Sequence, residues 1–181
     1  LFSAVTGALT VLVVYWCGIR LTRRVLPALL GAVVLGTATT FWSQATTANV
    51  RSLTALLAAL LILALIEFRI ACLNNNKQRI DQWLILAALV SGIGLAHHVS
   101  LIFLMLVGLI FVFWVDTSLI RSPRRWWRPL LAGALGLLPL LYLPLRATAD
   151  VRGASPDLAT WPGFVEHALA TGFRGDLFAY L

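Results

Sequence analysis

Charged residues are scarce in this chain. Only 12% of its 181 residues are Asp, Glu, Lys or Arg, whereas about a quarter of the residues in a soluble domain are charged. Hydrophobic residues make up 60% of the chain, and the mean hydropathy is +0.91. This balance excludes an ordinary soluble domain and indicates a protein that lies in a membrane.

The chain also lacks stretches in which polar and apolar residues alternate, as they would in a membrane-spanning strand. Backbone groups in lipid must form hydrogen bonds within their own segment, and several apolar runs approach the roughly 20 residues of a spanning helix. We therefore predict an all-α, polytopic membrane helix bundle with about six transmembrane helices. The transmembrane domain is expected over residues 1–145 and an external segment over 146–181.

Motifs of soluble enzymes are missing as well. There is no P-loop, GxGxxG, GxSxG or HExxH pattern, which excludes soluble nucleotide chemistry. The two cysteines, Cys17 and Cys72, lie in or at the end of apolar runs without CxxC spacing, so we interpret them as small buried residues. The chain begins inside an apolar run without Met, and we expect it to be an internal piece of a longer protein.

The apolar runs predict where the helices lie. We expect membrane helices over residues 1–19, 25–40, 52–73, 82–96, 99–119 and 129–145. Trp126 and Trp127 are expected to lie in an interfacial aromatic belt. Beyond residue 145, Thr160 and Pro162 predict the start of a short amphipathic helix, with an apolar stripe from Trp161 to Leu169, on the membrane surface.

The basic residues indicate an orientation. The net charge of +7 comes from short clusters between apolar runs, not from a basic face with interleaved aromatics, so no nucleic-acid partner is expected. Nine basic residues follow the first, third and fifth predicted helices: Arg20, Arg23, Arg24, Lys77, Arg79, Arg121, Arg124, Arg125 and Arg128. The opposite side carries four: Arg51, Arg146, Arg152 and Arg174. The positive-inside rule makes the first set cytoplasmic.

A polar loop over residues 41–51 then falls on the external face. Its sequence, Phe-Trp-Ser-Gln-Ala-Thr-Thr-Ala-Asn-Val-Arg, lies between two apolar runs. Gln44 and Asn49 offer donors and acceptors suited to sugar hydroxyls, and Arg51 suits a phosphate. Trp42 is read as an interface anchor or a substrate contact. The alternative is a solvated loop in which Asn49 or Ser52 caps the next helix.

His97 and His98 form a tight reversal on the same predicted face. Neighbouring residues of a helix point about 100° apart, so this pair does not have metal-ligand spacing, and we expect neither a metal nor a cofactor. The pair either binds substrate or caps the hairpin. Arg146 either snorkels to the interface or binds an anionic head group. Glu67, inside the third predicted helix, is costly in lipid and is expected to pair with Arg20 or Arg23 as a structural element.

Four segments carry a family resemblance. Phe41-Trp42-Ser43-Gln44-Ala45, followed by Ala48-Asn49-Val50 and Leu53, resembles the outer loop of the transmembrane protein 260 family. Gly92-Ile93-Gly94-Leu95-Ala96-His97-His98 is similar to its Gly-rich approach to a histidine pair. Leu141-Tyr142-Leu143-Pro144-Leu145-Arg146-Ala147 and the stretch Trp161–His167 are similar to later elements of the family. In this order, the four segments cover nearly the whole chain.

The resemblance implies a GT-C-like, inverting glycosyltransferase in the membrane. Such an enzyme moves a mannose-like sugar from a polyprenyl-phosphate donor to a protein or glycan acceptor. The substrate would be bound by Trp42, Gln44, Asn49, Arg51, His97, His98 and Arg146. The resemblance places the catalytic carboxylate on a first external loop ahead of Leu1, so no catalytic residue is assigned here. A bacterial inner membrane, with the active face on the periplasmic side, is expected.

The competing hypothesis is a transporter or flippase for a lipid-linked or small polar substrate. A transporter would carry inverted repeats, broken helices and polar groups near the middle of the membrane. The polar residues of this chain concentrate at the predicted helix ends, which favours the transferase. A non-catalytic scaffold is a third reading that the sequence leaves open.

Overall fold

The computed structural model describes residues 1–47, 50–149 and 156–168, and every regular element within them is a helix, which confirms the all-α prediction. The α-helices are α1 Phe2–Thr22, α2 Val25–Thr37, α3 Thr39–Thr46, α4 Arg51–Leu73, α5 Lys77–His97, α6 Leu101–Val115, α7 Trp127–Gly136, α8 Tyr142–Thr148 and α9 Trp161–Ala168. Short 3-10 turns are η1 Thr117–Arg121, η2 Pro123–Arg125, η3 Leu138–Leu141 and η4 Pro156–Ala159.

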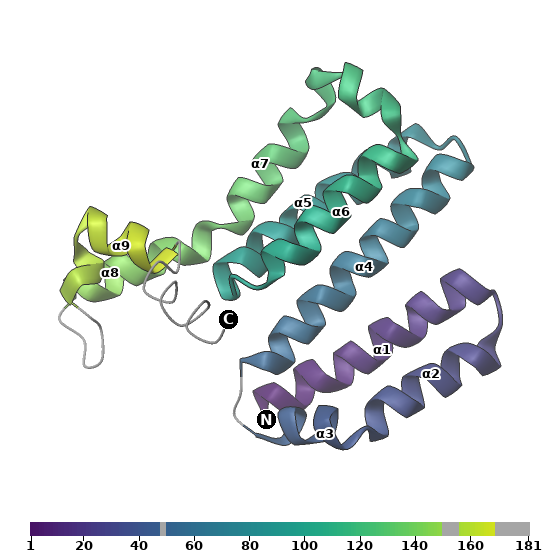
Figure 1. Ribbon diagram of the computed structural model, residues 1–181, viewed down its shortest axis with the longest axis horizontal. Helices are drawn as coiled ribbons and strands as arrows, with labels where there is room; N and C mark the ends of the chain where they lie inside the picture. The colour runs from purple at the N-terminus through teal and green to yellow at the C-terminus, as the bar shows by residue number, and fades with distance from the viewer. Residues whose placement is uncertain (48–49, 150–155, 169–181) are drawn as a thin grey trace, which may run out of the picture.

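The long helices lie side by side and run alternately up and down (Figure 1). One end of the bundle holds the α1–α2, α4–α5 and α6–α7 connections. We call it the basic end, because it holds the nine basic residues that follow the first, third and fifth predicted helices. The helix α3, the α5–α6 turn and the helices α8 and α9 lie at the other end, called the α3 end. The two sets of connections predicted from the sequence are thus separated in space.

Four helical segments are long and apolar enough to cross a membrane: Phe2–Thr22, Arg51–Leu73, Lys77–His97 and Pro123–Thr148. A fifth is present if α2 and α3, which are bent by 62° at their junction, form one span. Helix α6 was expected as a span over residues 99–119 but has only 15 residues, short of the roughly 20 that a bilayer requires. The described residues therefore support four or five spans, and the expected sixth is not found.

Residues 41–46 were predicted as a loop and are helical. Helix α2 stops at Thr37, and α3 begins after the extended residue Ala38. The Thr46 hydroxyl of α3 bonds to the helix's own backbone, donating to the Trp42 carbonyl at 3.0 Å. Such i to i−4 bonds satisfy the hydroxyl groups without a loop, which is why polarity alone misled the prediction.

Helix α3 packs across the start of α1 because Gly7 has no side chain. A Cβ atom on Gly7 would lie 2.8 Å from the Cβ of Ala45, closer than two carbon atoms pack. This close approach brings α3 against α1 and places Trp42 and Gln44 at the α3 end of the bundle.

Two other helix boundaries differ from the prediction because of side-chain caps. Helix α5 begins at Lys77, five residues before the predicted start at 82, because the Asn76 side chain accepts a hydrogen bond from the Arg79 amide at 3.1 Å. Helix α6 ends at Val115, and Asp116 starts the 3-10 turn η1 by accepting a hydrogen bond from the Ser118 amide at 3.1 Å. The predicted helix over residues 129–145 is divided among α7, η3 and α8.

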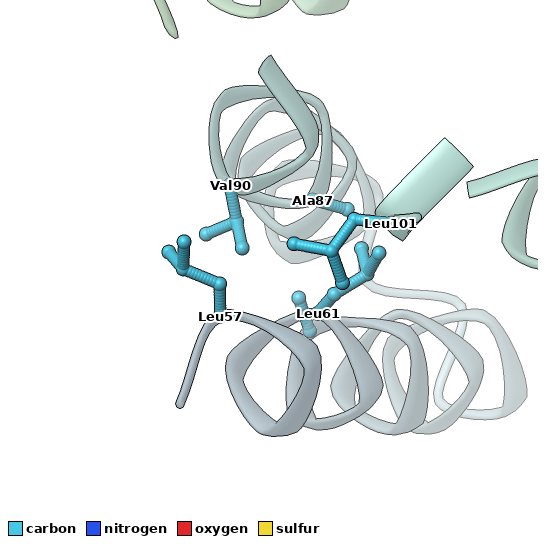
Figure 2. Packing of buried hydrophobic residues seen from close by; sticks show 6 residues of the cluster. Leu57, Leu61, Ala87, Val90 and Leu101 are labelled. Atoms are coloured by element: carbon cyan, nitrogen blue, oxygen red, sulfur yellow. The ribbon is translucent and has the colours of Figure 1, made fainter. Parts of the chain in front are cut away.

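The core lies between α4, α5 and α6. Figure 2 shows Leu57 and Leu61 of α4 facing Ala87 and Val90 of α5, with Leu101 of α6 beside them. A second buried cluster, nearer the basic end, contains the fully buried side chains of Phe68 and Leu119. Helix α4 contributes side chains to both clusters, and α5 and α6 pack against it.

Of the two tryptophans expected in an interfacial belt, one packs inward. The indole N–H of Trp126 donates to the Leu119 carbonyl at 3.0 Å, and its ring lies 5.3 Å from that of Phe113. Trp127 is 57% exposed. The hydrogen bond satisfies the indole nitrogen of Trp126, so this ring can pack into the bundle.

Helices α5 and α7 approach closely through glycines. A Cβ atom on Gly136 would lie 2.5 Å from the carbonyl oxygen of Leu89, and one on Gly92 would overlap the carbonyl oxygen of Gly133. Small residues that let helix backbones touch are typical of membrane bundles. Helix α7 thereby continues the bundle beyond α5.

The cap of the short C-terminal helix α9 was predicted correctly. The hydroxyl oxygen of Thr160 accepts a hydrogen bond from the Gly163 amide at 3.3 Å, and the hydroxyl donates to the Asp157 carbonyl at 2.8 Å. The Trp161 and Phe164 rings lie 5.9 Å apart on one side of the helix. Leu169, expected at the end of the apolar stripe, lies outside the described residues.

Candidate functional site

The described candidate residues all lie at the α3 end of the bundle (Figure 1). Trp42 and Gln44 belong to α3, and Arg51 is the first residue of α4. His97 ends α5, His98 follows it, and Arg146 belongs to α8. Asn49 lies outside the described residues.

A hydrogen bond joins two of the predicted segments. The Nε2 atom of His97 lies 3.0 Å from the carbonyl oxygen of Val50. Because a carbonyl only accepts, Nε2 carries the proton, and Nδ1 of the neutral ring is left as an acceptor. The end of α5 is thereby held against the start of α4, next to Arg51.

His98 has a different, local role. Its Nδ1 atom accepts a hydrogen bond from the Ser100 amide at 3.2 Å and lies 2.8 Å from the Ser100 hydroxyl oxygen. These bonds shape the turn between α5 and α6. This is the hairpin-capping role that the sequence left open, and the exposed ring still borders the same end of the bundle.

A buried hydroxyl pair supports the start of α4. The Thr6 hydroxyl donates to Ser52 Oγ at 3.0 Å, and both residues are buried. Sequence reasoning missed this link. The signal was present, because Ser3, Thr6 and Thr10 recur at helical spacing along an otherwise apolar run and lie on one buried face of α1.

Arg146 stands apart from the other candidates. Helix α8 lies well away from α3 (Figure 1). The Arg146 guanidinium carbon lies 5.6 Å from the centre of the Tyr142 ring, one turn earlier on the same helix. Spacing of four residues between an aromatic ring and a cation predicts such a contact, but it went unnoticed in the sequence.

The basic end holds two ion-pair arrangements. The predicted partner of Glu67 is confirmed: Arg20 donates from a guanidinium N–H to Glu67 Oε2 at 2.7 Å, and the carboxyl group is buried. Arg125 bridges Asp81, at 2.9 Å, and Asp116, at 3.2 Å. This second link ties α5 to the segment after α6, and sequence reasoning did not identify it.

The structure offers no metal centre in residues 1–47, 50–149 and 156–168, where no group of three or more His, Cys, Asp or Glu side chains is placed to hold an ion. The α3 end carries hydrogen-bonding and cationic side chains, among them Gln44, His97 and Arg51. Such groups bind hydroxyls and phosphates.

Comparison with protein-family models gives a match. The family model described as the protein O-mannosyl-transferase TMEM260 N-terminal domain matches residues 1–120. No curated protein matches the chain. No solved structure matches it either. Because the match covers about two thirds of the chain and runs from α1 through α6 into η1, the chain belongs to the TMEM260 family of protein O-mannosyl-transferases and is an integral membrane protein.

Proposed function

We propose that this chain is the membrane part of a glycosyltransferase that moves a mannose-like sugar from a polyprenyl-phosphate donor to a protein or glycan acceptor. The family match is the observation that carries this proposal. The hydrogen bond between His97 and Val50 supports the location of the site at the α3 end, because it joins the end of α5 to the start of α4.

Arg51 is proposed to bind the donor phosphate. A guanidinium binds a phosphate through two parallel hydrogen bonds. Arg51 is the first residue of α4, and the first turn of that helix contains no acidic residue. The partial positive charge of a helix N-terminus adds to the attraction for an anion there.

Gln44 and His97 are proposed to hold sugar hydroxyls. The Gln44 amide supplies both donors and an acceptor. Nδ1 of His97 is an acceptor in the tautomer that the Val50 carbonyl requires. Trp42, which is 63% exposed, offers an aromatic face for the sugar ring or the lipid.

In the reaction, the acceptor oxygen bonds to the anomeric carbon while the bond from that carbon to the donor phosphate oxygen breaks. The negative charge that develops on the phosphate is stabilised by Arg51. The acceptor hydroxyl proton passes to a carboxylate base, as the family resemblance implies. We propose a bacterial inner membrane with the α3 end on the periplasmic side, in keeping with the nine basic residues at the other end.

The test uses the full-length protein in vesicles that contain a polyprenyl-phosphate mannose labelled in the sugar, with membrane proteins as acceptors. We expect label in covalent product, and we expect Arg51→Ala to slow its formation about a hundredfold, the typical cost of removing one group that stabilises developing charge. The matched control, Arg69→Ala, removes an exposed arginine near the basic end and should keep the wild-type rate. Label that crosses the bilayer still attached to its lipid, without covalent product, would favour a transporter and refute the transferase.

A further inference from the structure

A cavity of about 660 Å³ lies at the basic end, away from the proposed transfer site. Helices α1 and α5 both pack on α4, and the cavity is an open cleft lined by residues of these three helices. It is lined by Trp16 and Arg20 of α1, Leu63 and Glu67 of α4, and Arg79, Gln82, Trp83 and Leu86 of α5.

The lining is sorted by polarity along the bundle. Because α1 and α4 run toward the basic end, Arg20 and Glu67 lie one turn nearer to that end than Trp16 and Leu63. Helix α5 starts at the basic end, so its polar lining residues, Arg79 and Gln82, precede the apolar Trp83 and Leu86. All three helices therefore give the cavity a polar mouth and an apolar interior.

The mouth carries a net positive charge. It contains two arginines and one carboxylate. The buried Glu67 carboxylate is held by Arg20 at 2.7 Å. The Arg79 side chain is exposed and forms no ion pair within the part of the chain that the structure describes. An anion that enters the mouth thus meets the uncompensated charge of Arg79 beside the amide of Gln82.

We propose that this cavity binds an anionic phospholipid of the leaflet at the basic end. The phosphate would lie at Arg79 and Gln82, and an acyl chain would run inward between Trp16 and Trp83. A free anion would use only the mouth, whereas a lipid uses both halves. All three walls, α1, α4 and α5, are themselves long and apolar enough to cross a membrane, so the cavity adjoins acyl chains. Clusters of basic residues beside a membrane attract anionic lipids.

The experiment measures which lipids stay bound to the purified full-length protein after detergent exchange, by native mass spectrometry. Dioleoyl phosphatidylglycerol is compared with dioleoyl phosphatidylcholine, which has the same acyl chains and no net charge. We expect phosphatidylglycerol to be retained preferentially. Arg79→Gln should lower this preference about fivefold, the effect of one basic residue at an anionic surface.

Two further variants separate the halves of the cavity from the general charge of the protein. Trp16→Ala should lower the retention of both lipids and leave their ratio unchanged, since Trp16 is 56% exposed and its loss spares the core. Arg69→Gln removes an exposed arginine near the same end that does not line the cavity and should leave the ratio at its wild-type value.

Equal retention of the two lipids by the wild-type protein would overturn the proposal. So would an equal loss of preference in Arg69→Gln and Arg79→Gln, which would make the preference a property of the whole basic end. Displacement of the lipid by inorganic phosphate would assign the site to a free anion instead. No sugar donor is present in the assay, so its outcome is independent of the proposed transferase activity.

Discussion

The imidazole of His97 lies 3.0 Å from the carbonyl oxygen of Val50, although 47 positions separate the two residues in the chain. The contact joins the end of α5 to the start of α4. It is the point where two segments with predicted binding residues, 41–51 and 97–98, meet in the fold.

We expect His97→Ala to loosen the start of α4. Loss of one hydrogen bond costs about 1 kcal/mol, which corresponds to roughly fivefold faster exchange of the amides it protects. Hydrogen exchange of the amides of residues 51–54 measures this effect. His98→Ala is the control, because His98 bonds locally to Ser100; an equal effect of both variants would contradict the specific role of His97.

The Arg20–Glu67 pair should contribute to stability only as a pair. Arg20→Leu leaves a buried carboxylate without its partner, and because Arg20 keeps 33% of its side chain exposed, we expect a loss of about 2 kcal/mol, below that of a fully buried pair. The double variant Arg20→Leu/Glu67→Leu should recover most of the lost free energy of unfolding. The free energy of unfolding in detergent is the measurement. A double variant less stable than Arg20→Leu would show that the carboxylate has another stabilising contact.

Gly92 and Gly136, where α5 meets α7, should tolerate no side chain. We expect Gly92→Ala to lower the free energy of unfolding by about 2 kcal/mol, because its methyl group would overlap the Gly133 carbonyl. Gly31→Ala is a matched control in α2, where a Cβ atom meets nothing within 4 Å. It should be neutral or stabilising by up to about 1 kcal/mol, from the higher helix propensity of alanine. Equal effects of the two substitutions would refute the close-packing argument.

Arg125 should act through its planar guanidinium. Lysine presents a single charged nitrogen and cannot hold Asp81 and Asp116 in the same geometry. We therefore expect Arg125→Lys to cost about 1 kcal/mol in unfolding free energy at low salt, and less at high salt because Asp81 is half exposed. Arg121→Lys, at an exposed position near the same end, should have no measurable effect. A salt-independent loss in Arg125→Lys would indicate altered packing rather than electrostatics.

The local signals in the sequence predicted some contacts correctly. The cost of a carboxylate in an apolar helix predicted an arginine partner for Glu67, and the Thr160 cap followed from a Thr before a Pro in the first turn. The helical state of residues 41–46 was not predicted, because their hydroxyl groups bond to their own backbone. Asn76 indicated the early start of α5 at Lys77, because Asn is a common residue at the N-cap of a helix. The prediction was based on apolar residues and missed this cap.

The sequence by itself determined that this protein is an all-helical membrane protein, because long apolar runs with few charges can satisfy their backbone groups in lipid only as helices. It also determined that basic and polar connections alternate along the chain. The tertiary structure decided which of these connections touch: it brought His97 to Val50 and left Arg146 on Tyr142, away from α3. Contacts between distant segments depend on how closely helices pack, and that is set by small residues such as Gly7 and Gly92, whose effect appears only when two helices meet.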